Sequence, residues 1–278
     1  MDIYLDNYLV NSAYLGLFII VLLAAKWVYN LTTPYDTVKQ LSEHRNTSLA
    51  ISISGYLFAV SIIYFCVLAG PSQGLLNDLI NVSIYSALGM ALLVLSRWIN
   101  DKFLLHAFCN TEQLIDKQNL ATGIAQAASY LSSSLLIGGA LAGEGSWLSA
   151  VVFYLLGQAL LILFARLYDY LTQFDVQEQL QEQNLAAAVS FSATLIAVGV
   201  ILFHAISGQF ISWQQSLTLF AIDSAIAFLV LPFMRLLVDK VLLPNIVLDT
   251  AIAERNIAVA LIEGSLAICV ALAILVAL

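Results

Sequence analysis

The chain has 278 residues, of which 61% are hydrophobic and only 10% are charged. A soluble domain carries about 25% charged residues, so this composition excludes an ordinary soluble protein and indicates an integral membrane protein. The formal net charge of −8 lies mostly in loops, and no basic patch suited to nucleic acid accompanies it.

Long apolar runs recur along the whole sequence. Each has about 20 residues, the length at which an α-helix crosses a hydrocarbon core of about 30 Å. Alternating ten-residue strands are absent from the sequence, which argues against an outer-membrane barrel. We therefore expect an all-α polytopic membrane bundle with a lipid bilayer as its main partner. The predicted spans cover residues 8–30, 48–70, 78–99, 121–143, 148–169, 185–207, 214–237 and 257–278.

The N-terminal segment MDIYLDNYLV is acidic and has neither a basic region nor a small-residue cleavage site. We expect no signal peptide, so the first span stays in the mature protein.

The ten lysines and arginines predict the orientation. All ten fall at the ends of the first, third, fifth and seventh spans or in the loops that follow them. The connections after the second, fourth and sixth spans contain none. Short loops rich in Lys and Arg face the cytoplasm. Both termini are therefore expected outside, with four longer connections inside.

The sequence contains an internal repeat with an offset of about 138 residues. The segment SRWINDKFLL (96–105) aligns with MRLLVDKVLL (234–243), which matches Arg97 with Arg235. We predict two four-helix membrane repeats, residues 1–143 and 144–278. Each half has an even number of spans, so the two repeats are expected to be parallel rather than inverted.

One motif occurs four times, each time where the chain enters a span from the predicted cytoplasmic side. An asparagine precedes a run of small residues in TSLA, LATG, LAAA and IAVA. Asparagine is a good helix N-cap, and small residues let membrane helices approach closely. We interpret the four as structural caps, while a ring of free helix amides could also attract anions. They are Asn46, Asn119, Asn184 and Asn256.

These features resemble the bacterial domain-of-unknown-function 350 membrane family. The resemblance rests on LTTPYDTVKQL after the first span, on the Asn-led helix starts and on the Arg that closes the third span. It covers nearly the whole chain as two copies of a four-helix unit, and the second copy departs at TQFD (172–175), which lacks an equivalent of Pro34. The resemblance implies a multi-pass protein of the bacterial inner (plasma) membrane, and it brings no established catalytic residues.

Two acids within spans are the strongest candidates for a functional role. Asp223 lies near the middle of the seventh span, and Glu263 lies seven residues after Asn256 in the eighth. The aligned positions of the first half hold Tyr85 and Gln126. An acid inside a membrane is expensive and usually faces the bundle interior. We expect either a polar path for cations or protons along these four positions, or neutral acids hydrogen-bonded to neighbouring helices.

Arg97 and Arg235 are expected to lie at the membrane interface, each with an acid four residues later, Asp101 and Asp239. Tyrosines and a tryptophan near the same ends of other spans are expected to form an aromatic belt. They are Trp27, Tyr29, Tyr168 and Tyr170.

No recognisable catalytic or cofactor motif occurs. The three histidines and three cysteines are scattered, which does not fit a metal site, and no nucleophile has a base nearby. We expect no enzyme activity, no cofactor and no metal.

Two hypotheses follow for function. The first is transport or conduction of a cation or proton through the bundle. The alternative is a non-transporting scaffold or stress-response subunit whose short amphipathic cytoplasmic segments recruit a soluble protein. A homo-oligomer is compatible with either.

Overall fold

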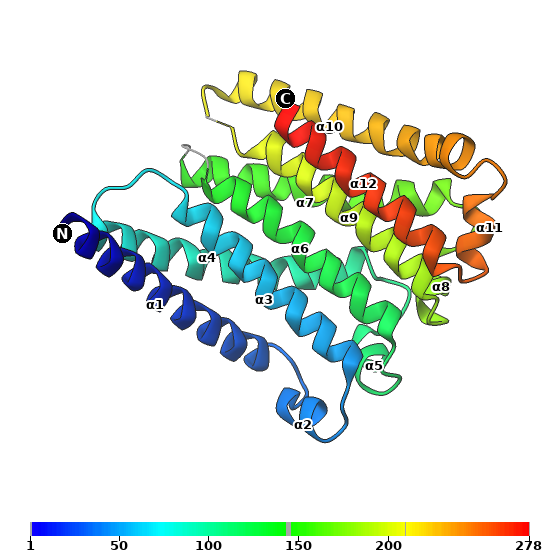
Figure 1. Cartoon of the computed structure of the whole chain (residues 1–278), viewed down its shortest axis with the longest axis horizontal. Coiled ribbons are helices and arrows are strands. Elements are labelled where there is room, and N and C mark those ends of the chain that lie inside the picture. Colours follow the sequence, from blue (N-terminus) through cyan, green and yellow to red (C-terminus); the bar gives the residue numbers. More distant parts are fainter. Residues whose placement is uncertain (1, 143–145, 209, 278) are drawn as a thin grey trace.

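The computed structural model describes residues 2–142, 146–208 and 210–277 (Figure 1). This part of the chain is helical and contains no strand. Eight of its helices are long and apolar enough to cross a membrane, which confirms the predicted all-α bundle and its eight spans. The long helices are α1 (Asp2–Leu31), α3 (Thr47–Leu68), α4 (Leu75–Phe103), α6 (Leu120–Ala142), α7 (Trp147–Leu171), α9 (Leu185–Ile206), α10 (Trp213–Leu237) and α12 (Ile257–Ala277).

Four six-residue helices connect the long ones at one end of the bundle. They are α2 (Thr37–Ser42), α5 (Asn110–Ile115), α8 (Val176–Gln181) and α11 (Leu248–Ala253). Figure 1 shows them along the lower right, opposite the end that holds both termini. We call this the short-helix end. It is the end that the basic residues mark as cytoplasmic in the prediction above.

The long helices form two rows. The inner row is α3, α6, α9 and α12, in which each helix packs along the next. The outer row is α1, α4, α7 and α10, whose members contact the inner helices beside them. The chain thus passes through four similar units, each an outer helix, a short helix and an inner helix. The twofold repeat seen in the sequence is, in the fold, a fourfold one.

The same turn leads into every inner helix. The residue before each capping asparagine has a positive φ, a conformation rare for side chains other than glycine, and it ends the short helix as an αL residue does. The asparagine side-chain oxygen then accepts from backbone amides of the first helical turn, as expected of an N-cap. The bonds come from Leu49 to Asn46, from Thr122 to Asn119, from Ala186 and Ala187 to Asn184, and from Val259 to Asn256.

Small residues let the inner helices approach closely. A Cβ atom added to Gly55 would lie 2.5 Å from Cβ of Ala127, between α3 and α6. A Cβ added to Gly264 would lie 2.6 Å from Cβ of Ala193, between α9 and α12. Membrane helices gain packing energy from such contacts because lipid offers no hydrophobic drive between them.

The third and seventh spans run further than predicted at the short-helix end. Helix α4 continues to Phe103, and α10 passes at Leu237 into a π-helix, η1 (Val238–Leu242). Pro232 lies inside α10 and removes one of its backbone hydrogen bonds. Arg235 therefore lies between two irregular points of the helix.

Candidate functional site

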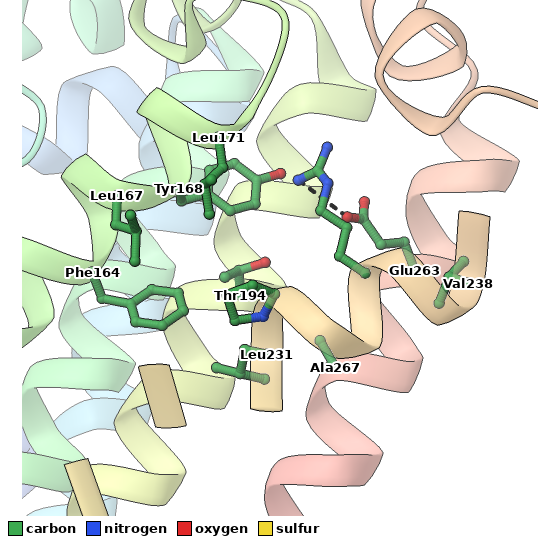
Figure 2. A pocket seen from close by; sticks show the side chains of 11 residues that line it. Phe164, Leu167, Tyr168, Leu171, Thr194, Leu231, Val238, Glu263 and Ala267 are labelled. Atoms are coloured by element: carbon green, nitrogen blue, oxygen red, sulfur yellow. Dashed lines mark ion pairs between the residues drawn. The ribbon is translucent and has the colours of Figure 1, made fainter. Parts of the chain in front are cut away.

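A buried charged cluster lies near the short-helix end of the second repeat. Arg235 projects from α10 and is only 17% exposed. Its guanidinium forms ion pairs with Glu263 of α12, at 3.3 Å between Nη1 and Oε1, and with Asp249 of α11 through Nη2. Figure 2 shows Glu263 facing this guanidinium across the space that Tyr168 also borders. One cation therefore has two carboxylate partners.

A serine of α9 holds the second carboxylate oxygen, and a tyrosine of α7 bonds to that serine. Ser190 of α9 donates to Oε2 of Glu263 at 2.5 Å, and the hydroxyls of Tyr168 and Ser190 lie 2.6 Å apart. The Arg235 guanidinium carbon stands 5.0 Å from the centre of the Tyr168 ring, within cation–π range. Four helices thus position one buried carboxylate.

Two cavities meet at Arg235. One of about 300 Å³ is partly open and is lined by Asp239 and Asp249 as well as Arg235. The other, about 40 Å³, is lined by Arg235, Glu263 and Tyr168, with apolar residues and Thr194 around them (Figure 2). A water molecule needs about 10–15 Å³ on this measure, so the inner cavity has room for a few. Because Arg235 lines both cavities, they form a recess between the short-helix end and Glu263 whose lining is mainly apolar.

The first repeat contains an equivalent cluster with different chemistry. Arg97 of α4 is 13% exposed and stands 5.1 Å from the centre of the Tyr29 ring. Ser52 of α3 donates at 2.5 Å to Oε1 of Gln126 of α6, where the second repeat has a carboxylate. The acid here is Asp101, 3.9 Å from Arg97.

Two of the differences between the clusters change their charge. Glu263 replaces Gln126, and Asp249, the second residue of α11, stands where α5 has Thr111. Both changes add a carboxylate beside the same arginine. The second cluster therefore carries more acid than its arginine neutralises, while the first contains one acid and one arginine.

The structure separates the four residues predicted to line a polar path. Glu263 and Gln126 are buried in the two clusters described above. Tyr85 is 43% exposed and lines an open cavity of about 750 Å³ with Asp78, a residue near the opposite end of α4. Asp223 is half-buried, twelve residues before Arg235 on α10, or about 18 Å along the helix. The cavity at Glu263 does not include it, and among the described residues it makes no hydrogen bond or ion pair.

The two arginines expected at the membrane interface are both largely buried inside the bundle. Arg97 keeps its predicted partner Asp101, but Arg235 does not pair with Asp239, whose carboxylate instead accepts from the backbone amide of Leu248. Arg235 turns inward because Glu263 and Asp249 provide stronger partners there.

Sequence reasoning missed the hydroxyl groups of Tyr168 and Ser190 and the carboxylate of Asp249. Tyr29 and Tyr168 were expected in an aromatic belt, yet both are buried beneath the arginines, whereas Trp27 and Tyr170 are exposed. The repeat carried a usable signal, since the two tyrosines align with each other, as do Ser52 and Ser190. Asp249 had no such signal because its counterpart is a threonine.

Comparison with known proteins supports a membrane assignment. The chain is 23% identical over 232 residues to a UPF0719 transmembrane protein of Aquifex aeolicus (strain VF5), which covers 81% of this chain and 83% of that protein. No solved structure matches the chain. Together with the eight apolar helices, this likeness identifies a multi-pass membrane protein. Residues 3–141 and 143–278 each match the family described as Domain of Unknown Function (DUF350), so the chain belongs to that family as two tandem copies.

Proposed function

We propose that the protein conducts protons or small cations across a bacterial inner membrane, with Glu263 as the residue that binds them. The observation that carries this proposal is the excess of acid around Arg235. Because Asp249 also pairs with the guanidinium, Glu263 can take up a proton or cation without leaving Arg235 uncompensated. In the first repeat Gln126 has no exchangeable charge.

Access from one side supports the same proposal. Arg235 lines both the partly open cavity at the short-helix end and the inner cavity that Glu263 lines, so one side chain stands between that opening and Glu263. Beyond Glu263 the inner cavity is lined by apolar side chains such as Phe164, Leu231 and Ala267. This recess is one half of a path, and the other half requires a movement of the helices.

Helix α10 is suited to such a movement. Pro232 interrupts its hydrogen bonding, and a π-helix follows Arg235 at Val238–Leu242. Both features occur where helices bend or adjust at functional sites. Protonation of Glu263 would release Arg235 toward Asp249, and the helix around Pro232 would transmit this shift toward Asp223 on α10.

The test is a flux measurement in liposomes. Purified protein is reconstituted with an internal pH dye, and an electrical potential is applied with potassium and valinomycin. We expect wild-type protein to move protons, and Glu263→Gln, which copies the first repeat, to abolish the flux. The control is Glu112→Gln, a substitution of an exposed acid on α5, which should conduct normally. If wild type passes neither protons nor sodium or potassium, or if Glu263→Gln conducts like wild type, the proposal fails.

The alternative function is a membrane scaffold that recruits a soluble protein. The observation that favours it is the row of four short helices at one end of the bundle, which offers a repeated surface (Figure 1). Photo-crosslinkers at exposed Val38 on α2 and Val247 before α11 should then capture one reproducible partner in cells. A probe at exposed Leu76, at the opposite end, is the matched control.

A further inference from the structure

The contact between successive units is the same at three places in the chain. The first three capping asparagines each use the side-chain oxygen within their own unit and donate from Nδ2 to a backbone carbonyl of the next unit's short helix. The acceptor is the fifth residue of that helix every time. The three bonds are Asn46 to Leu114 at 2.7 Å, Asn119 to Leu180 at 2.7 Å, and Asn184 to Ile252 at 2.8 Å.

Within the described ranges, the asparagine amide of this contact has no acceptor at one end of the inner row, and at the other end the carbonyl has no asparagine donor. Asn46, Asn119 and Asn184 are buried, but Asn256 is exposed, and in the described part of the chain its Nδ2 meets no acceptor. At the opposite edge, the fifth residue of α2 is Leu41. Among the described residues no asparagine donates to its carbonyl. The fourth asparagine thus presents the same donor as the other three without the neighbour that receives it.

The inner helices repeat the same pattern of small residues. Counted from the asparagine, position 9 of one unit packs on position 8 of the next, as Gly55 does on Ala127 and Ala193 on Gly264. Position 13 of one unit packs on position 15 of the next, as Ser132 does on Gly199. A Cβ added to Gly199 would lie 2.9 Å from Cα of Ser132. These contacts fix which residues of a following unit would face α12.

The outward face of α12 has the residues that such a contact needs. Positions 2, 9 and 13 after Asn256 are Ala258, Ser265 and Cys269, all small and all exposed. The corresponding positions are buried in the three preceding inner helices. On the free edge of α3, positions 4, 8 and 15 after Asn46 are also small. They are Ala50, Ser54 and Ser61.

Exposed apolar surface alone does not indicate a protein–protein contact in a membrane, because lipid covers such surface as well as protein does. Complementary small residues and an unused amide donor are different, since lipid tails provide neither close backbone packing nor a carbonyl. Figure 1 shows α3 and α12 at opposite edges of the inner row, so one molecule cannot close this contact on itself. A second copy of the chain presents the missing edge in the correct register.

We propose that copies of this protein associate head to tail, with α12 and Asn256 of one copy packed against α3 and α2 of the next as a fourth repeat of the internal contact. In this contact Asn256 donates to the carbonyl of Leu41, Ser265 faces Ser54, and Cys269 faces Ser61. Such an interface joins two different surfaces, so it yields a closed ring or an open row rather than a twofold dimer.

Disulfide crosslinking tests the register. In a background with Cys66→Ala and Cys109→Ala, Ser61→Cys is introduced so that it opposes the natural Cys269. Mild oxidation of membranes should then produce a ladder of dimers and higher species on a non-reducing gel. The same background with Cys269 alone should stay monomeric, and so should Leu163→Cys with Cys269, which pairs the natural cysteine with an exposed position on α7. Absence of a ladder from the Ser61→Cys variant, or equal crosslinking by Cys269 alone, would overturn the proposal.

A second measurement separates assembly from folding. Asn256→Asp keeps the capping oxygen but loses the amide donor, since Asp caps a helix about as well as Asn. Single-molecule photobleaching or native mass spectrometry in detergent should show association weakened about three- to fivefold, the effect of one hydrogen bond between membrane helices. Ser265→Phe should give monomers with unchanged thermal unfolding. If Ser265→Phe still forms oligomers of the wild-type size, the proposed contact face on α12 is wrong.

Discussion

The two arginine clusters share a framework and differ in charge. In both, an arginine of one outer helix lies over a tyrosine ring of the preceding outer helix. A serine donates to the side chain seven residues after the capping asparagine of the next inner helix. The first cluster accepts this bond with Gln126 and the second with Glu263. The comparison shows that the two repeats share the arginine–tyrosine stack and the serine hydrogen bond, while Glu263 and Asp249 add acid to the second cluster alone.

Removal of the arginine should produce the largest difference between the repeats. Arg235→Ala leaves Glu263 and Asp249 buried near each other without a cation, which should lower the free energy of unfolding by about 3–5 kcal/mol. Arg97→Ala leaves Asp101 with hydrogen bonds from Asn110 and Gln126, so the loss should be about 1–2 kcal/mol. Unfolding of both variants in mixed micelles with a rising fraction of denaturing detergent measures the difference.

A double variant provides the control for that prediction. Arg235→Ala combined with Glu263→Gln removes one of the two unpaired acids and should recover a large part of the lost stability. Equal losses in Arg235→Ala with and without Glu263→Gln would mean that the extra carboxylate is not what distinguishes the second cluster.

The glycine contacts offer a second comparison, because the glycine lies on different helices in the two halves. Gly55→Ala should destabilise the protein by about 1–3 kcal/mol, since its Cβ would overlap Ala127. Adding Ala127→Gly recreates the Ala193–Gly264 arrangement and should restore most of the stability. Thermal unfolding in detergent tests both variants, and failure of the second substitution to restore stability would show that the two contacts are not interchangeable.

The internal asparagine bonds should be worth less, but still measurably so. Asn184→Asp retains the N-cap and removes the donor to Ile252, whose carbonyl keeps the backbone hydrogen bond from Arg255. We expect a loss of about 0.5–1.5 kcal/mol, the net contribution of one hydrogen bond. The same exchange at exposed Asn256 should leave the unfolding of a monomer within about 0.5 kcal/mol of wild type. Hydrogen exchange at the amides of α11 should increase in Asn184→Asp only.

The smallest effect is expected at Asp223. It makes no ion pair among the described residues, so Asp223→Asn should change the free energy of unfolding by less than about 0.5 kcal/mol. Its effect on proton flux is the informative readout, because loss of flux without loss of stability would place it on the path beyond Glu263. Normal flux would restrict the path to the Glu263 cluster.

The framework was predictable from the sequence and the cluster only partly so. Span length, basic loops and the 138-residue offset reflect local composition, and they predicted eight helices and two copies. Glu263 and Gln126 were paired by the alignment of the repeats. The ion pairs of Arg235 were not predictable, because Asp239 is closer in sequence and only the tertiary fold brings Asp249 and Glu263 beside Arg235. Asp223 was predicted to be functional because an acid inside a membrane span is energetically unfavourable, although the fold gives it no partner among the described residues.

The repeated unit also affects how such a protein can change in length. Each unit enters and leaves the membrane on the same side, through one outer and one inner helix, and contacts chiefly the units beside it. A unit can therefore be gained or lost in evolution without inverting the orientation of those that follow. The turn with a positive φ before each asparagine, at Arg45, Gln118, Gln183 and Arg255, lies inside its unit and would be gained or lost together with it.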